Sequence, residues 1–167
     1  MNPALLLLCY LIGSISFPGI YAKMKGIDLR KRAGHLGASS IYFATGSKLG
    51  VVMCGLLDVL KGSVCYLLAG TAGSAAGMVG HIFPVFFNFE GGNAVSMYYG
   101  TLLAANPKLV SVGLVELVIF LLLRKRSRAL RQVLYLCVRA LPALLFPPVL
   151  PLYGILLFRH IYFFFLK

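Results

Sequence analysis

A short polar segment of the chain has the residue types of an anion-binding loop. It contains Gly34, His35, Gly37, Ser39 and Ser40. The basic residues just before it are Lys23, Lys25, Arg30, Lys31 and Arg32. Glycines expose backbone N–H groups, serine hydroxyls donate hydrogen bonds, and a helix starting after Ser40 would add the positive end of its dipole. The segment predicts a phosphate-binding loop; the alternative is an ordinary turn beside a basic anchor for anionic lipid headgroups.

Charged and imidazole side chains also lie inside long apolar runs, where an unpaired charge costs at least about 2.5 kcal/mol. Asp58 and Lys61 are three residues apart and share one helical face. They form either an internal ion pair that stabilises the packing or one wall of a polar site. His81 and the pair Arg159 and His160 lie in two other runs. Polar groups from three helices at a similar depth favour a polar site over isolated packing residues.

A second glycine-rich point and one further acid complete the polar inventory. Glu90, Gly91, Gly92 and Asn93 are consecutive and predict a turn between two apolar runs. Glu116 lies inside a later run and has no partner that the sequence makes obvious. We interpret Glu116 as structural or interfacial.

The composition identifies the environment of these residues as a membrane. Of 167 residues, 60% are hydrophobic and only 12% are charged, with a mean hydropathy of +0.90. Soluble domains carry about 25% charged residues, so an ordinary globule, a disordered tail and a fibrous repeat are excluded. The net charge of +12 does not indicate nucleic-acid binding, because the basic residues separate long apolar runs instead of covering a soluble core.

The apolar runs predict a polytopic bundle of about seven transmembrane helices, all-α and folded as a single domain over residues 1–167. A spanning helix needs about 20 mostly apolar residues, and its backbone must satisfy its own hydrogen bonds in lipid. The predicted spans are residues 4–22, 49–70, 71–89, 94–105, 109–123, 133–149 and 150–166.

The basic residues also predict the orientation of the bundle. One cluster covers residues 23–32 and the other contains Arg124, Lys125, Arg126, Arg128 and Arg131. With seven spans both clusters fall on one side, and short cytoplasmic loops are rich in Lys and Arg. We therefore expect the N-terminus outside, the C-terminus in the cytoplasm, and a multi-pass location in the plasma (inner) membrane. A cleaved signal peptide is disfavoured, because no positive charge precedes the first apolar run.

Several motifs resemble the bacterial acyl-phosphate:glycerol-3-phosphate acyltransferase family, PlsY. In chain order they are Gly13–Phe17, Gly26–Arg30, Gly37–Ser39, Leu57–Gly62, Gly80–Phe86 and Gly91–Gly92. The resemblance covers about the first 105 residues in register; beyond them it rests on the hydrophobic pattern and on Arg159 and His160. It implies a seven-helix enzyme that moves a fatty acyl group from acyl phosphate to the 1-hydroxyl of glycerol 3-phosphate. It also implies that no metal or other cofactor is needed.

This chain departs from the family pattern where the resemblance places the chemistry. Ala33 and His35 stand where the family has serine and asparagine, and Ser39-Ser40 replaces threonine-asparagine. Phe43 stands at the position of an arginine and Asn93 at that of a lysine. Phe163 stands where an asparagine follows His160 by three residues. Because lost oxyanion donors each lower the rate by about 10²- to 10³-fold, we expect acyl transfer to be weak, altered or lost.

The resemblance and the residue types together give three sets of candidates. The catalytic candidates are His81, His160 and Ser39. The substrate- or phosphate-binding candidates are Gly34, His35, Gly37, Ser39, Ser40, Gly91, Gly92 and Asn93. The buried polar support consists of Asp58, Lys61 and Arg159. The expected partners are membrane lipid, acyl phosphate and glycerol 3-phosphate. The alternative function is an inactive homologue that binds lipid or a membrane protein partner; nucleic acid is not expected.

Overall fold

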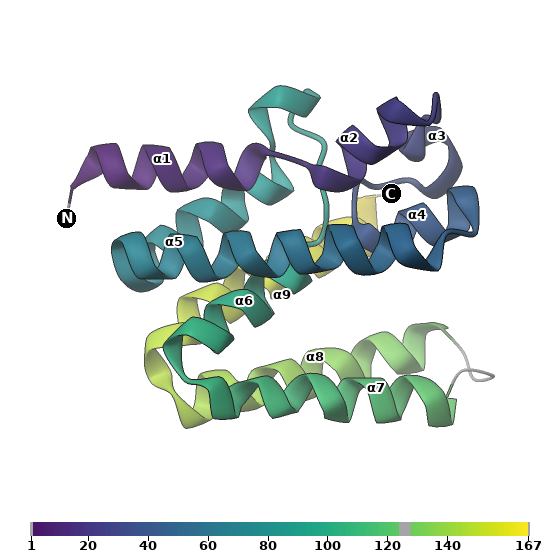
Figure 1. The fold of residues 1–167 in the computed structure, drawn as a ribbon. Helices are drawn as coiled ribbons and strands as arrows, with labels where there is room; N and C mark the ends of the chain where they lie inside the picture. Colours follow the sequence, from purple (N-terminus) through teal and green to yellow (C-terminus); the bar gives the residue numbers. More distant parts are fainter. Residues whose placement is uncertain (1, 124–127, 167) are drawn as a thin grey trace.

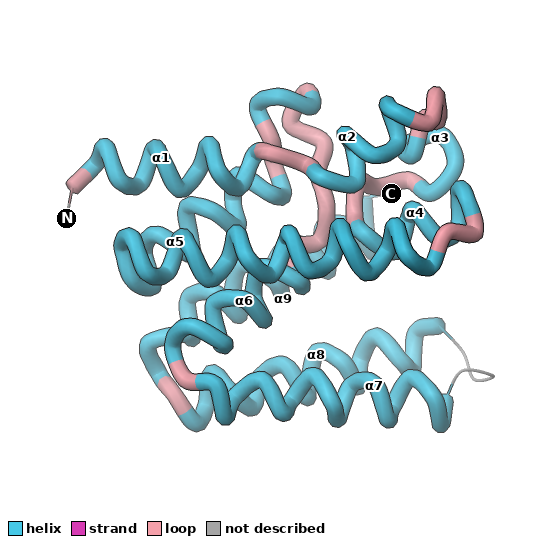
Figure 2. The backbone as a smooth tube through the Cα atoms, in the orientation of Figure 1, coloured by secondary structure: helices cyan, strands magenta, loops and turns pink. Residues whose placement is uncertain are grey.

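The computed structural model describes residues 2–123 and 128–166, and all regular structure within them is helical (Figures 1 and 2). The α-helices are α1 (Pro3–Ser14), α2 (Phe17–Met24), α3 (Leu29–Ala33), α4 (Ala38–Thr45), α5 (Lys48–Ile82), α6 (Val95–Ala105), α7 (Ser111–Leu123), α8 (Arg128–Leu145) and α9 (Leu150–Leu166). Short 3-10 turns cover Val85–Phe87, Pro107–Val110 and Pro147–Val149. The predicted all-α class is therefore confirmed for the described residues. Arg124, Lys125 and Arg126 of the second basic cluster lie outside them.

The first predicted span, residues 4–22, is not one continuous helix. Helix α1 ends at Ser14, and Ile15 and Ser16 are extended. The Ser16 hydroxyl accepts a hydrogen bond from the Gly19 amide and so caps a new helix, α2, which has Pro18 in its first turn. Ser16 and Pro18 are both residues that favour a helix start, and together they outweigh the continuous apolar pattern.

Helix α5 contains the boundary that the sequence predicts between residues 70 and 71. Ala69 and Gly70 have non-helical backbone angles, and Gly70 has φ of +59°. The chain reverses there, since Lys61 and His81 are in contact although they are 20 residues apart. A straight helix would separate them by about 30 Å. Figure 1 shows the resulting bend, with α1 packed along α5.

The third predicted span ends earlier than expected. Its helix stops at Ile82 instead of Phe89, because Pro84 has no backbone N–H and disfavours a helical conformation at Phe83. The connection to α6 is correspondingly longer than the expected turn and carries the 3-10 turn Val85–Phe87. It brings Gly91 and Gly92 back over the end of α5, where their amides donate to the carbonyls of Ile82 and His81.

The predicted long polar loop, residues 23–48, contains the two short helices α3 and α4. Asp28 caps α3 by accepting hydrogen bonds from the amides of Arg30 and Lys31. Helix α4 begins at Ala38, so Ser39 and Ser40 lie inside it, and the expectation that a helix starts after Ser40 is wrong. The sixth predicted span, residues 133–149, corresponds to α8, which starts five residues earlier, and to the turn after it. The seventh coincides with α9.

Helix α5 is the centre of the packing and contacts α1, α4, α6 and α9, while α7 and α8 form an adjacent pair (Figure 1). The main apolar core includes Met97, Tyr98, Leu102, Leu152 and Leu156. Large apolar side chains also cover the outside; Leu67 and Leu122, for example, are both 75% exposed. Two helical stretches, Pro3–Met24 and Lys48–Phe87, are long and apolar enough to cross a bilayer, and Val133–Leu145 is a shorter apolar helix.

Glycines allow the close approach of α5 to α6. A Cβ atom on Gly62 would lie 2.0 Å from the carbonyl oxygen of Met97, and one on Gly100 would lie 1.9 Å from that of Val59. Both distances are far below van der Waals contact. Small residues commonly allow helix backbones to meet in this way within membranes.

Candidate functional site

A cavity of about 430 Å³ brings together residues from α4, α5, α8, α9 and the loops before α4 and α6. The predicted site residues that line it are His35, Gly37, Ser39, Asp58, His81, Asn93 and His160. These residues span more than 120 positions of the sequence, so only the helix packing could place them together. We call this space the main cavity. A larger cavity, of about 530 Å³ between α2, α3 and the turn Val85–Phe87, is lined by none of the predicted site residues.

A smaller cavity of about 80 Å³ takes half of the remaining candidates. Gly34, Gly91 and Arg159 line it, and His35 borders both it and the main cavity. Arg30 also lines it; this guanidinium donates to the Phe87 carbonyl and lies 3.3 Å from the carboxylate of Glu90. Ser40, Gly92 and Lys61 border neither cavity, and each of them contacts a residue that does.

The loop before α4 is organised around His35 instead of an open cradle of donors. The Gly37 amide donates to Nδ1 of His35 at 3.0 Å, and the Ser40 hydroxyl lies 2.9 Å from the same atom. These two donors therefore serve the imidazole, and binding of an anion by this loop stays a prediction. Ser39 and His35 remain at the wall of the main cavity.

Lys61 lies at the junction of three helical segments and is buried, with 5% of its surface exposed. Its ammonium donates to the carbonyls of Gly13 and Ile15 and lies 2.9 Å from Oδ1 of Asp58 and 3.3 Å from Nδ1 of His81. An ammonium has three donors, so these four acceptors occupy it fully. Lys61 is thus an internal support, as one of the two interpretations of the pair held, whereas Asp58 also lines the main cavity.

His81 packs against the glycine-rich loop, residues 90–93. Because Nδ1 faces the Lys61 ammonium, it is assigned as an acceptor, which leaves the proton on Nε2. A Cβ atom on Gly92 would lie only 2.4 Å from that Nε2 atom, so only glycine fits there. The carbonyl of Gly92 accepts a hydrogen bond from Nε of Arg159. The loop is thereby held between α5 and α9.

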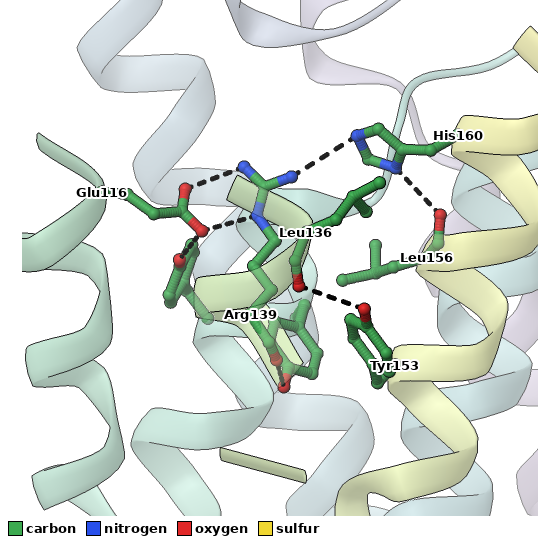
Figure 3. Close-up of polar contacts among 8 residues, drawn as sticks. Glu116, Leu136, Arg139, Tyr153, Leu156 and His160 are labelled. Carbon is green, nitrogen blue, oxygen red and sulfur yellow. Dashed lines mark hydrogen bonds and ion pairs between the residues drawn. The ribbon is translucent and has the colours of Figure 1, made fainter. Parts of the chain in front are cut away.

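Glu116 has a partner that the sequence did not make obvious. Its carboxylate accepts two hydrogen bonds from Arg139, at 2.6 Å from Nε and 2.8 Å from Nη2 (Figure 3). Tyr99 adds a third, from its hydroxyl at 2.5 Å. The Arg139 backbone is fixed as well, because its carbonyl accepts from the Tyr98 hydroxyl.

Arg139 is the site residue that the sequence reasoning missed. It is 7% exposed and lines the main cavity beside Asn93 and His160. One signal pointed to it, namely an arginine inside the predicted span of residues 133–149, where an ionised residue is costly and rarely without a role.

His160 presents one ring nitrogen to this group. Its Nδ1 lies 2.9 Å from the carbonyl of Leu156 one turn earlier and is assigned as the donor there. Nε2 then carries a lone pair, and it lies 3.4 Å from Nη1 of Arg139 (Figure 3). This lone pair can take a proton from a hydroxyl only when the guanidinium no longer occupies it.

Among the described residues, no three His, Cys, Asp or Glu side chains gather as potential metal ligands. The expectation that the chemistry needs no metal or other cofactor stays a prediction.

Comparison with known proteins places this arrangement in a family context. The family model for glycerol-3-phosphate acyltransferase matches residues 3–166. The glycerol-3-phosphate acyltransferase of Aquifex aeolicus is 34% identical, with 93% of this chain and 90% of the relative covered. Glycerol-3-phosphate acyltransferase 2 of Bacillus anthracis is 41% identical, with 75% and 70% covered.

Two crystal structures of PlsY (YgiH), described as an integral membrane glycerol 3-phosphate acyltransferase, have the same fold. The glycerol 3-phosphate form superposes with a TM-score of 0.78 at 31% identity, and the lysophosphatidic acid form with 0.77 at 30%. Each comparison covers 93% of this chain and 86% of the other.

Proposed function

Since the chain belongs to the glycerol-3-phosphate acyltransferase family and is an integral membrane protein, we propose that it transfers an acyl group from acyl phosphate to glycerol 3-phosphate. The observation that carries this proposal is the main cavity, where the loop before α4, the loop before α6 and His160 meet. It brings imidazole side chains and polar groups from five parts of the chain into one space.

In this reaction a hydroxyl oxygen of glycerol 3-phosphate forms a new bond to the acyl carbon, and the bond from that carbon to the phosphate oxygen breaks. The products are lysophosphatidic acid and inorganic phosphate. Nε2 of His160 accepts the hydroxyl proton once Arg139 turns from it to a bound substrate, since His160 lines the main cavity and its Nδ1 is held by the Leu156 carbonyl. His35, Ser39 and Asn93 provide polar contacts to the substrates, while His81 and Lys61 keep the loops in place.

We propose a turnover below that of a family member with the full motif pattern. Asn93 lines the main cavity where the family pattern has a lysine, and an amide cannot stabilise developing negative charge as an ammonium can. Phe43, at the position of an arginine, is 77% exposed and borders none of the cavities described above.

The same two positions favour a second candidate, a catalytically inactive homologue that binds lipid or a membrane protein partner. The two are separated by purifying the protein in detergent, supplying acyl phosphate and glycerol 3-phosphate, and measuring lysophosphatidic acid. Turnover that disappears in His81→Ala or Ser39→Ala excludes the inactive homologue. No turnover, together with a co-purifying membrane protein, contradicts acyl transfer and supports the subunit.

We further propose that the bundle crosses the plasma (inner) membrane seven times, with its N-terminus outside and its C-terminus in the cytoplasm. The site then opens toward the cytoplasm, where the soluble substrate is. Single cysteines at Asn2, Lys25 and Glu90 in a cysteine-free background test this. We expect an impermeant thiol reagent to label position 2 from outside and the other two from inside. Outside labelling of position 25 or 90 overturns the orientation.

A further inference from the structure

We propose that Arg139 binds the phosphate group of a substrate in the main cavity, and that Glu116 holds it in position from behind. The proposal rests on the function above only for its choice of ligand, a phosphate monoester or acyl phosphate. Nothing in the family motifs points to Arg139, which lies in the last third of the chain, where the resemblance is limited to the hydrophobic pattern, Arg159 and His160.

The first argument is charge. Among the described residues that line the main cavity, Arg139 is the one lysine or arginine, and Asp58 is the one acid. The Asp58 carboxylate is already paired with Lys61. A phosphate group in this space therefore meets one guanidinium, whose charge is shared with Glu116, and guanidinium is the side chain best matched to phosphate oxygens.

The second argument is direction. Glu116 binds Arg139 through Nε and Nη2 and accepts a third hydrogen bond from Tyr99, and neither Glu116 nor Tyr99 lines the main cavity. A guanidinium has five N–H donors. The carboxylate takes one on Nε and one on Nη2, and His160 faces one on Nη1, so one donor remains on each Nη. Nη1 lies toward His160, which does line the cavity (Figure 3). The carboxylate thus holds one edge of the guanidinium and turns the other toward the ligand space.

The third argument is that the ion pair between Arg139 and Glu116 has more than a structural role. A buried pair of this kind is often no more stabilising than apolar residues of similar volume. Helices α7 and α8 could pack through leucines, as much of their surface does. A guanidinium fixed by Glu116 and flanked by the Tyr135 ring at 5.5 Å is instead a preorganised binding group, which loses little freedom when an anion arrives.

The test measures binding, so that it is independent of turnover. Calorimetric titration of the detergent-purified protein gives Kd for glycerol 3-phosphate, acetyl phosphate and, as the uncharged control, glycerol. We expect Arg139→Met to raise Kd for a phosphate ligand by about 10- to 100-fold, because a hydrogen bond to a charged group is lost. Arg139→Lys keeps the positive charge but not the planar geometry of the guanidinium, and it should raise Kd less than Arg139→Met does. Arg32→Met, an exposed arginine that borders none of the cavities described above, is the matched control and should leave Kd unchanged.

Because Arg139→Met leaves Glu116 buried without its partner, a double variant, Glu116→Gln with Arg139→Met, separates folding from binding. We expect the double variant to regain the thermal midpoint that the single variant loses, while Kd stays raised. The proposal is overturned if the double variant regains both the thermal midpoint and the wild-type Kd. It is also overturned if the wild-type protein binds neither phosphate ligand. The ligand whose Kd rises identifies the substrate that Arg139 holds. If the wild-type protein binds phosphate ligands through Arg139 but forms no lysophosphatidic acid, acyl transfer is contradicted and this inference stands. If the protein turns over and the double variant has an unchanged Kd, this inference is contradicted and acyl transfer stands.

Discussion

The ammonium nitrogen of Lys61 lies 3.3 Å from Nδ1 of His81, across the two arms into which the chain reversal divides α5. The same ammonium reaches the carbonyls of Gly13 and Ile15, where α1 ends and the chain turns into α2. One side chain therefore ties together the first helix, both arms of α5 and the histidine under the glycine-rich loop. This relationship makes Lys61 a stability residue.

Replacement of Lys61 by methionine is expected to destabilise the protein by about 3–5 kcal/mol, because it leaves Asp58 buried without its cation. Thermal unfolding in detergent measures the loss. Lys48→Met is the matched control, since Lys48 is exposed at the start of the same helix. Equal thermal midpoints for the two variants would contradict the assignment of Lys61 as the internal support.

The close contact between α5 and α6 gives a second prediction. Gly100→Ala places a Cβ atom 1.9 Å from the backbone carbonyl of Val59, which cannot move aside without shifting a helix. We expect overpacking to lower stability by at least about 1–3 kcal/mol. Gly154→Ala, a glycine with open space around its Cβ position, should be neutral or slightly stabilising. Thermal midpoints of the two variants test the contrast, and a Gly100→Ala protein that unfolds like the Gly154→Ala protein would refute it.

The fold was largely predictable because lipid restricts what a chain can do. Apolar length alone locates most helices, and the predicted boundary at Gly70 and the bounds of α9 agree with the structure. The predictions failed where local chemistry competes with hydropathy. Ser16 starts a new helix inside an apolar run, and Pro84 ends α5 before the apolar run ends. The short helices α3 and α4 are set by an Asp28 cap and by glycines, which hydropathy does not register.

The candidate site was also predictable only in part. Residues in recognisable motifs, such as Asp58, His81 and Asn93, do meet at one cavity. The contact between Arg139 and Glu116 could not be predicted from spacing. The two residues are 23 positions apart in the sequence and meet only through the packing of α7 on α8. A pairing of this kind depends on how helices rotate against each other. Helix α8 carries its polar residues on one face, but α7 is apolar on nearly all faces, and such a pattern does not specify its rotation.

His160 gives a kinetic prediction that distinguishes proton transfer from binding. Glutamine at this position keeps polarity but cannot take up a proton, so kcat for lysophosphatidic acid formation should fall by about 10²- to 10⁴-fold. The Kd for glycerol 3-phosphate should change much less. Tyr153→Phe is the control on the same helix, since it removes a hydrogen bond to the Leu136 carbonyl outside the main cavity. An equal fall in kcat for both variants would assign His160 to packing.

Asn93 and Phe43, two of the positions that depart from the family pattern, are predicted to affect the reaction rate differently when the family residue is restored. Asn93 lines the main cavity, so Asn93→Lys adds a second cation beside Arg139 and His160 where negative charge develops. We expect lysophosphatidic acid formation to rise on the order of tenfold or more, or to become detectable if the wild-type protein has none. Phe43→Arg alone should change the rate by less than about threefold, because an exposed side chain acts through solvent-screened charge. The rates of both single variants, measured with saturating acyl phosphate, decide the matter. A larger gain from Phe43→Arg would mean that α4 turns toward the main cavity when substrate binds.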